Sequence, residues 1–146
     1  MTRNLDEQKT QLLEMLNSFD KACSKHEIGY VLAYGTALGA VREGGFIPWD
    51  TDIDISVKTD QIPRLLSALE LELEGSPWKV YDHNSDSRYE TLFPRIGLRD
   101  GGHIGAHIDI FPLAGAPSSP RKQRLFRLVS KVAFRINFVK KVPVSD

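Results

Sequence analysis

The segment from Asp52 to Val57 most constrains the fold, because its polar and aliphatic residues alternate with a period of two. That period is typical of a β-strand with one face in a core and the other face polar. Residues two apart in a strand point to the same side, so Asp52 and Asp54 should present adjacent carboxylates while Ile53 and Ile55 enter the core. The chain must therefore contain a sheet whose polar face carries acids.

A third acid lies in similar surroundings, because Asp109 alternates with apolar neighbours in the segment 107–111. If this strand lies beside the first, three carboxylates converge, and such groups repel each other unless they share a cation or a proton. Oxygen ligands favour hard cations, so we expect Asp52, Asp54 and Asp109 to hold Mg²⁺ or Mn²⁺. A site of this kind suits displacement at phosphorus.

A candidate anion site follows the short apolar strand predicted at residues 30–34. We expect a short helix at 37–42 with Thr36 as its N-cap, ended by the glycines that follow. Backbone N–H groups at a helix start can bind phosphate, so Gly35 and Thr36 are candidate substrate-binding residues. Arg42, at the far end of the same helix, is a candidate for neutralising phosphate charge.

The remaining periodicities predict a mixed α/β (α+β) fold, a small mixed sheet flanked by helices, in one domain that spans residues 1–146. Asn4 and Glu7 fit a capping box at the first helix, and Pro94 indicates a sheet edge or bulge. Asp100-Gly101-Gly102 is a hairpin-turn signal. Helices are expected at 4–25, at 121–140 and after a cap at Thr59 or Asp60, and strands at 78–81, 89–98 and 103–111.

Charge is unevenly distributed along a chain whose formal net charge is zero. No acid occurs between Asp109 and Asp146, and the predicted helix at 121–140 is basic and amphipathic. Such a helix can lie on an anionic membrane; the alternatives are a solvated flank or packing against segments outside this chain. No window approaches the roughly 20 apolar residues of a spanning helix. A single cysteine, Cys23, fits a reducing cytoplasm.

Other polar residues support weaker hypotheses. His103, His107 and Asp109 share the parity of one strand, so a zinc site is an alternative to the carboxylate site. Trp49 could stack on a base, although core packing is the preferred interpretation. Arg88, Arg95 and Arg99 could contact phosphate, although ordinary positions on a strand surface are preferred.

The order of these motifs resembles the nucleotidyltransferase fold, with its glycine turn, its D-x-D strand and a later single acid. The longer segments resemble the LicD family specifically. They are YGTALGAVR at 34–42, GGFIPWDTDIDI at 44–55 and HIDIFPL at 107–113. The resemblance covers residues 30–113, the core motifs of the predicted domain.

Members of the LicD family move phosphocholine from CDP-choline to a sugar hydroxyl of lipopolysaccharide, teichoic acid or capsule. Their eukaryotic relatives, fukutin and fukutin-related protein, move ribitol phosphate. The resemblance thus implies a CDP-linked donor and a glycan or glycolipid acceptor, and we expect no nucleic-acid partner. We expect a cytoplasmic location, with contact to the inner face of the membrane through the basic C-terminal helix as a further hypothesis. It also implies that Asp109 completes the metal site and helps to deprotonate the acceptor, while Asp50 supports the site from its edge.

The sequence departs from the family pattern at three positions, which are Glu43, Thr51 and Ala114. The first two bear on donor or acceptor preference, and the third begins a shortened C-terminal part. We therefore expect either a short member of the family or one truncated at its C-terminus. The alternative functions are a nucleotidyltransferase that attaches a nucleoside monophosphate to a small acceptor and a non-catalytic nucleotide- or glycan-binding module.

Overall fold

The computed structural model describes residues 5–83, 85, 89, 91–100 and 105–141, and side chains only as far as residue 132 in the last helix. The chain divides into two compact units, residues 1–113 and 114–146. The elements are α1 (Leu5–Lys25), β1 (Tyr30–Leu32), α2 (Tyr34–Arg42), β2 (Ile53–Lys58), the 3₁₀ helix η1 (Thr59–Gln61), α3 (Ile62–Glu72), β3 (Trp78–Tyr81), β4 (Arg95–Leu98), β5 (Ile108–Leu113) and α4 (Pro120–Lys141).

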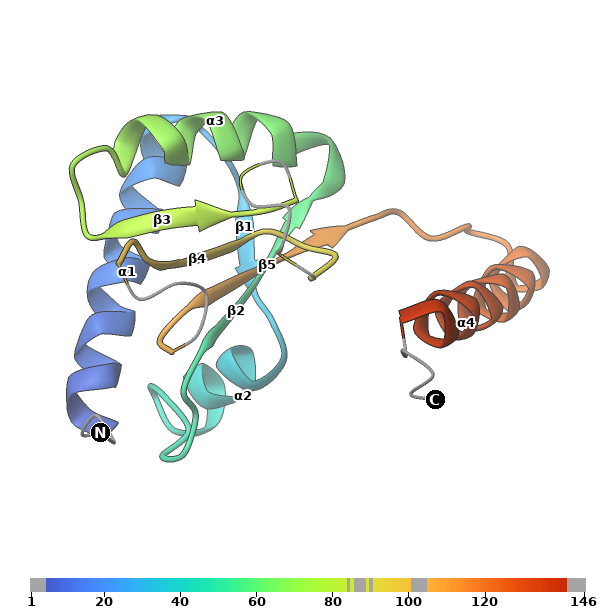
Figure 1. The fold of residues 1–146 in the computed structure, drawn as a ribbon. Coiled ribbons are helices and arrows are strands. Elements are labelled where there is room, and N and C mark those ends of the chain that lie inside the picture. The colour runs from blue at the N-terminus through green and yellow to red at the C-terminus, as the bar shows by residue number, and fades with distance from the viewer. Residues whose placement is uncertain (1–4, 84, 86–88, 90, 101–104, 142–146) are drawn as a thin grey trace, which may run out of the picture. The chain divides into compact units, whose positions relative to one another are not determined.

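The first unit is built on a five-stranded mixed sheet in the order β1-β2-β5-β4-β3 (Figure 1). The two acid-bearing strands, β2 and β5, are parallel neighbours at its centre, and the other neighbouring pairs are antiparallel. Parallel neighbours need a crossover connection, and η1, α3, β3 and β4 all lie between β2 and β5 in the sequence. The mixed α/β fold with a small sheet is confirmed.

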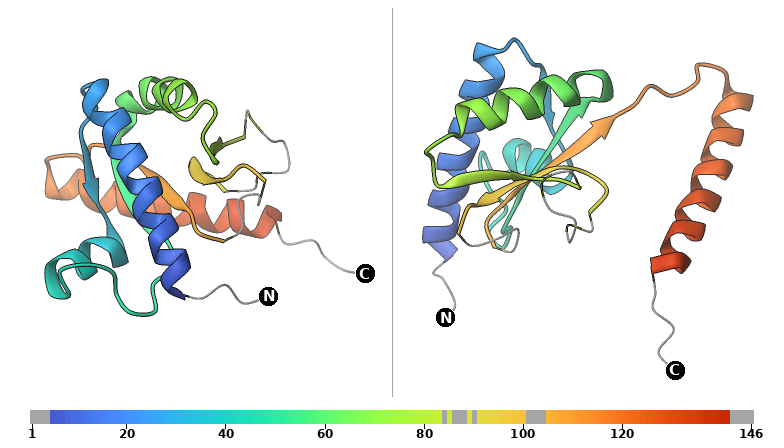
Figure 2. Two further views of the ribbon diagram at one scale, coloured as in Figure 1. Left: turned by 90° about the vertical axis from the view of Figure 1, so that its left-hand side faces the viewer. Right: turned by 45° about the horizontal axis from the view of Figure 1, so that its top comes forward.

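The core lies on the face of the sheet that α1 and α3 cover (Figure 2). Ile53 and Ile55 of β2 are fully buried, as the alternation predicted, and Ile108 and Ile110 of β5 join them. From the helices, Leu12 and Phe19 of α1 and Leu65 and Leu69 of α3 pack into the same cluster. Because side chains alternate along a strand, the acids of β2 and β5 face the opposite side.

The loop between α2 and β2 is fixed at both ends. Gly44 ends α2 in the left-handed conformation, with φ of 67°, which is the usual role of a glycine after a helix. Gln8 and Lys9 of α1 donate hydrogen bonds to the carbonyls of Thr51 and Pro48, at 3.1 and 3.0 Å. These contacts hold the chain just before Asp52.

Several predicted boundaries and caps were wrong. β4 begins at residue 95 rather than 89, directly after Pro94, which has no N–H to give to a ladder. β4 is also an inner strand rather than an edge. β5 runs from 108 to 113 rather than from 103 to 111. Neither Thr59 nor Asp60 caps α3, because they form η1 instead, and α3 has no side-chain cap.

Two further sequence predictions fall on residues outside the described part of the chain. The capping box depends on Asn4, and the hairpin turn depends on Gly101 and Gly102. The helix predicted at 4–25 is otherwise confirmed as α1.

The second unit contains α4, which confirms the helix predicted at 121–140 with one further residue at each end. Its described apolar side chains, Leu125, Phe126, Leu128, Val129 and Val132, are 49–62% exposed. Within the described residues, no helix is both long and apolar enough to cross a membrane.

Candidate metal centre

The acids of β2 and β5 meet where the two strands begin. Asp54 and Asp109 are register partners across the parallel pair, so their side chains leave the sheet on the same face. Asp52 directly precedes β2, two residues before Asp54. The backbone N–H of Ile53 donates to the carbonyl of His107 at 3.0 Å, which fixes the two strand starts side by side. The predicted neighbourhood of the two acid-bearing strands is confirmed.

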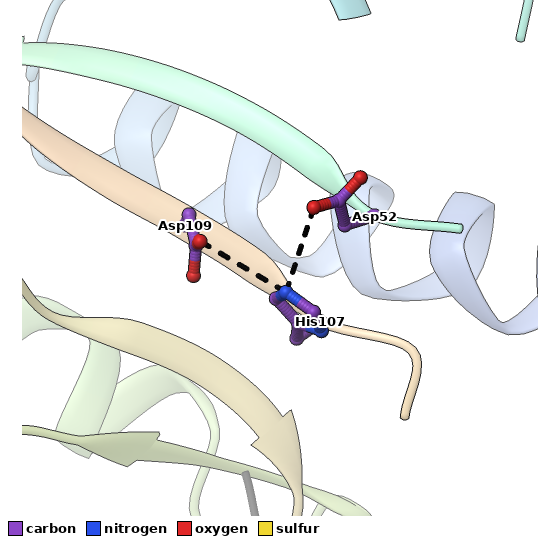
Figure 3. A group of neighbouring side chains, drawn as sticks. All are labelled: Asp52, His107 and Asp109. Atoms are coloured by element: carbon purple, nitrogen blue, oxygen red, sulfur yellow. Dashed lines mark ion pairs between the residues drawn. The ribbon is translucent and has the colours of Figure 1, made fainter. Parts of the chain in front are cut away.

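Three side chains form a group that could hold a metal ion, namely Asp52, His107 and Asp109 (Figure 3). One ligand atom from each lies within 4.8 Å of the others. The Nε2 atom of His107 is 3.7 Å from Oδ2 of Asp52 and 3.9 Å from Oδ2 of Asp109. Asp54 is not part of this group, so its role as a metal ligand stays a prediction.

Arg95 of β4 approaches the same acids from the other side. It is the register partner of Asp109, and its Nε and Nη2 donate to the two oxygens of that carboxylate at 2.5 and 3.0 Å. Asp109 is buried, at 6% exposure, so the paired guanidinium balances its charge where water cannot. The row Asp54, Asp109 and Arg95 therefore crosses three strands on one face of the sheet.

Burial and the crowding of acids raise the pKa of two carboxyls. Burial, followed by the charges of Asp52, Asp109 and Asp50, raises the pKa of Asp54 to about 6. Burial also raises the pKa of Asp52, and a hydrogen bond with the Asp50 carboxyl adds to this effect. Without a cation, Asp52 and Asp54 therefore hold their protons more tightly than ordinary carboxyls. A bound cation would offset the repulsion between the carboxylates and favour their ionised forms.

The start of α2 differs from its prediction. The helix begins at Tyr34, and its N-cap is Ala33 rather than Thr36. Tyr34 has a φ of 43°, in the left-handed region that a residue with a bulky side chain rarely adopts. Thr36 lies inside the first turn, where its hydroxyl accepts the backbone N–H of Asp54 at 2.8 Å. Thr36 thus connects α2 to the acid-bearing strand.

The other predicted substrate-binding residues divide into two groups. Gly35 lies against Asp50, because a Cβ on Gly35 would be 3.0 Å from its Oδ2 atom. Asp50 reaches the cluster through its hydrogen bond with Asp52. Arg42 instead pairs with Glu43 at 2.6 Å, and no contact recorded among the described residues joins it to the acids. The substrate-binding roles themselves stay predictions.

The weaker hypotheses have mixed outcomes. His103 and Arg88 lie outside the described residues. Arg99 donates to the carbonyls at the end of α3 and the start of β3, which is a structural role. Trp49 is 75% exposed, so the preferred interpretation of core packing was wrong.

Sequence reasoning missed two partnerships, which are Asp52 with His107 and Arg95 with Asp109. The zinc hypothesis placed His107 on the same face of one strand as Asp109. It took His103, rather than Asp52, as the third member of that group. The preferred interpretation of Arg95 as an ordinary surface residue was wrong, since its side chain is only 16% exposed. The missing signal was the register of β4 against β5, which no local pattern provides.

Comparisons with known proteins agree with this geometry. Residues 27–143 match the family described as "LicD/FKTN/FKRP, nucleotidyltransferase domain". A 62-residue segment is 42% identical to lipopolysaccharide cholinephosphotransferase LicD of Haemophilus influenzae. That segment is 42% of this chain and only 23% of the relative's length.

A solved structure shows the same fold at low sequence identity. It is titled "Crystal Structure of ANT(2")-Ia in complex with adenylyl-2"-tobramycin" and superposes with a TM-score of 0.50 at 17% identity. The match covers 75% of this chain and 53% of the other. Because the family match spans most of the chain and includes Asp50, Asp52, Asp54 and Asp109, the protein belongs to the LicD family of nucleotidyltransferase-fold domains.

Proposed function

We propose that the protein is a metal-dependent phosphotransferase. It moves a phospho-alcohol group, such as phosphocholine, from a CDP-linked donor such as CDP-choline to a hydroxyl of a cell-surface glycan (lipopolysaccharide, teichoic acid or capsule). The observation that carries this proposal is the convergence of Asp52, Asp54 and Asp109 beside the start of α2, in a chain of the LicD family. The named activity of the Haemophilus influenzae relative supports phosphocholine as the transferred group.

The cluster fits a divalent cation, Mg²⁺ or Mn²⁺, which would neutralise the diphosphate of the donor. Asp52 and Asp109 would hold it, since their oxygens belong to the group within 4.8 Å. Gly35 and Thr36 lie in the first turn of α2, where unpaired backbone N–H groups suit phosphate oxygens. Asp50 shares a hydrogen bond with Asp52 and so sets the position of that ligand.

A base must take the proton of the attacking hydroxyl. The resemblance gives this role to Asp109, but each of its oxygens already accepts a hydrogen bond from Arg95, so its lone pairs are partly occupied. Asp54 lies outside the group of three ligand candidates and is the register partner of Asp109 on the same face of the sheet. We therefore assign the base to Asp54, whose carboxylate is left to accept the proton of a hydroxyl bound at this face.

The ligand and base roles can be separated with two variants. Asp52→Asn should abolish both metal binding and metal-dependent transfer, whereas Asp54→Asn should abolish transfer and leave metal binding within a small factor. Loss of metal binding in Asp54→Asn would return that residue to the ligand set. Retention of transfer in Asp52→Asn would contradict the whole site assignment. Asp60→Asn, an exposed acid in η1, is the matched control.

Two assays test the donor and the reaction. Thermal stability should rise with a CDP-linked compound in the presence of Mg²⁺ or Mn²⁺, by about 2.7 kcal/mol at a hundredfold excess over Kd. Release of CMP would support transfer of the phospho-alcohol, whereas release of pyrophosphate from a nucleoside triphosphate would indicate a nucleotidyltransferase. A chain that melts cooperatively and responds to no nucleotide would be a non-catalytic module.

We also propose that α4 binds an anionic membrane surface, where a glycolipid acceptor would be found. Four of its exposed apolar residues, Leu125, Leu128, Val129 and Val132, share one sector of a helical projection, and Arg124, Arg127 and Lys131 lie outside that sector. No acid occurs in the helix, so its charge complements anionic headgroups. Sedimentation should be stronger with anionic than with neutral vesicles, and glutamine at Arg124, Arg127 and Lys131 should reduce the difference. Equal sedimentation with both vesicles would contradict the electrostatic attraction.

A further inference from the structure

His107 is held in one orientation at the edge of the acid cluster. Its side chain is 16% exposed, and its Nδ1 atom lies 2.5 Å from the backbone carbonyl of Gly105. A carbonyl oxygen only accepts hydrogen bonds, so Nδ1 must carry the proton of the neutral ring. The lone pair of the neutral ring is therefore on Nε2, which faces Asp52 and Asp109 (Figure 3).

The distances at Nε2 leave room for an ion between the three groups. At 3.7 and 3.9 Å, neither carboxylate oxygen is within hydrogen-bond distance of the ring nitrogen. Ligands bound at about 2.1 Å around one ion are about 3–4.2 Å apart, depending on the angle between them. A lone pair and two carboxylates that converge at this spacing repel one another until a cation binds them together.

We propose that His107 is a metal ligand through Nε2, so that Asp52, His107 and Asp109 form a one-nitrogen, two-carboxylate centre that prefers Mn²⁺ to Mg²⁺. This rests on the proposed metal-dependent function and adds a nitrogen ligand to a site otherwise made of oxygens. Mg²⁺ strongly favours oxygen ligands and water, whereas imidazole nitrogen suits transition metals. The hydrogen bond from Nδ1 to a backbone carbonyl is the usual outer-shell support of a metal-bound histidine.

The backbone prepares this ligand set before any ion binds. Asp52 and His107 each occupy the residue just before a central strand, and Ile53 and Ile108 are register partners. The hydrogen bond from the N–H of Ile53 to the carbonyl of His107 keeps the two ligands at the same level of the sheet. The pairing of the two central strands thus sets the relative position of Asp52 and His107.

The pairing of Asp109 with Arg95 is compatible with ligation. A carboxylate has about four lone-pair sites, and the guanidinium uses one on each oxygen. Oδ2 of Asp109, the atom nearer His107, therefore retains a site for a metal. Arg95 also balances part of the negative charge, so the centre carries less net negative charge than its two carboxylates alone would give.

Electron spin echo measurements on the Mn²⁺-loaded full chain test the proposal directly. Modulation from a directly bound ¹⁴N nucleus is expected in the wild-type protein, and it should disappear in His107→Gln. His83→Gln, which changes an exposed histidine outside the cluster, is the matched control and should retain the signal. Mn²⁺ affinity should fall in His107→Gln by at least the roughly 10- to 100-fold that loss of an outer-shell partner causes, with a smaller loss for Mg²⁺.

The outcomes separate this proposal from the proposed function. Mn²⁺ that binds without nitrogen modulation, yet is lost in Asp52→Asn, would overturn the role of His107 and leave the carboxylate site standing. Nitrogen modulation that persists in His107→Gln would also overturn it. A wild-type protein that binds neither Mn²⁺ nor Mg²⁺ would overturn both this proposal and the proposed metal-dependent transfer.

Discussion

Arg95 and Asp109 are register partners in adjacent antiparallel strands, and the guanidinium of one donates two hydrogen bonds to the carboxylate of the other. Their side chains are only 16% and 9% exposed, so the pair lies where an unpaired charge is costly. The structure of the acid cluster therefore depends on a cation that the protein itself supplies.

Removing that cation should destabilise the fold. Arg95→Gln leaves Asp109 buried and unpaired, and we expect the free energy of unfolding to fall by about 3–5 kcal/mol. Chemical denaturation measures this, with Arg64→Gln on the exposed face of α3 as the control. The double variant Arg95→Leu with Asp109→Leu should recover much of the loss. An equal loss in single and double variants would mean that packing, not charge, makes the contact important.

The pH dependence of stability should reflect Asp54. Its pKa is about 6 in the folded protein against an ordinary value of 3.8 for an aspartate, so the folded state binds the proton more tightly. The stabilisation is fully present below the unfolded pKa and is lost as the pH rises through about 6. In a chelator, Asp54→Asn should match the wild type near pH 4 and be the more stable protein above about pH 6. A difference that is constant with pH would contradict the shifted pKa.

Thr36 should matter through its hydroxyl. Thr36→Val keeps the shape of the side chain but leaves the half-buried N–H of Asp54 without its acceptor at 2.8 Å. We expect a loss of about 1–3 kcal/mol in unfolding free energy, with weaker metal binding because Asp54 and its neighbours shift. Thr36→Ser keeps the hydroxyl and should retain metal affinity. Loss of metal affinity in Thr36→Ser but not in Thr36→Val would indicate that the methyl group, not the hydroxyl, matters.

Gly39 should tolerate no side chain. A Cβ there would lie 2.6 Å from the carbonyl oxygen of Gly45 and 3.0 Å from the backbone nitrogen of Ile47. Because both atoms are backbone, Gly39→Ala must push α2 away from the loop before β2, at about 1–3 kcal/mol. Gly29→Ala meets nothing within 4 Å and is the control, expected to be neutral or slightly stabilising. Calorimetric melting of both variants would compare them.

Local patterns in the sequence predicted the parts of the fold that depend on neighbouring residues. The alternation at Asp52–Val57 identified β2 and its buried isoleucines, because period two is a property of the strand itself. The helical periodicity that predicted α1 and the glycine that ends α2 are likewise features of neighbouring residues in the sequence. Asp109 was associated with the other acids by the assumption that two similar strands are neighbours, and the register confirmed it.

The rest depended on contacts between distant segments. Thr36 was expected to cap a helix, which is the common local role of a threonine before a helical run. In the structure the left-handed Tyr34 starts α2 earlier, and the hydroxyl of Thr36 reaches across to β2. Likewise, Arg95 contacts Asp109 because the register of β4 against β5 places the two residues opposite each other. The sequence of either strand alone does not predict this register.

The parallel pairing of β2 and β5 also affects the order in which parts of the protein fold. As the chain is synthesised, Asp52 and Asp54 emerge long before His107 and Asp109, and the crossover between them includes α3, β3 and β4. Pairings between distant segments form late because the loop that joins them must first be closed. The proposed metal centre is therefore among the last parts of the protein to assemble, and a nascent chain interrupted before β5 would carry two acids without their partners.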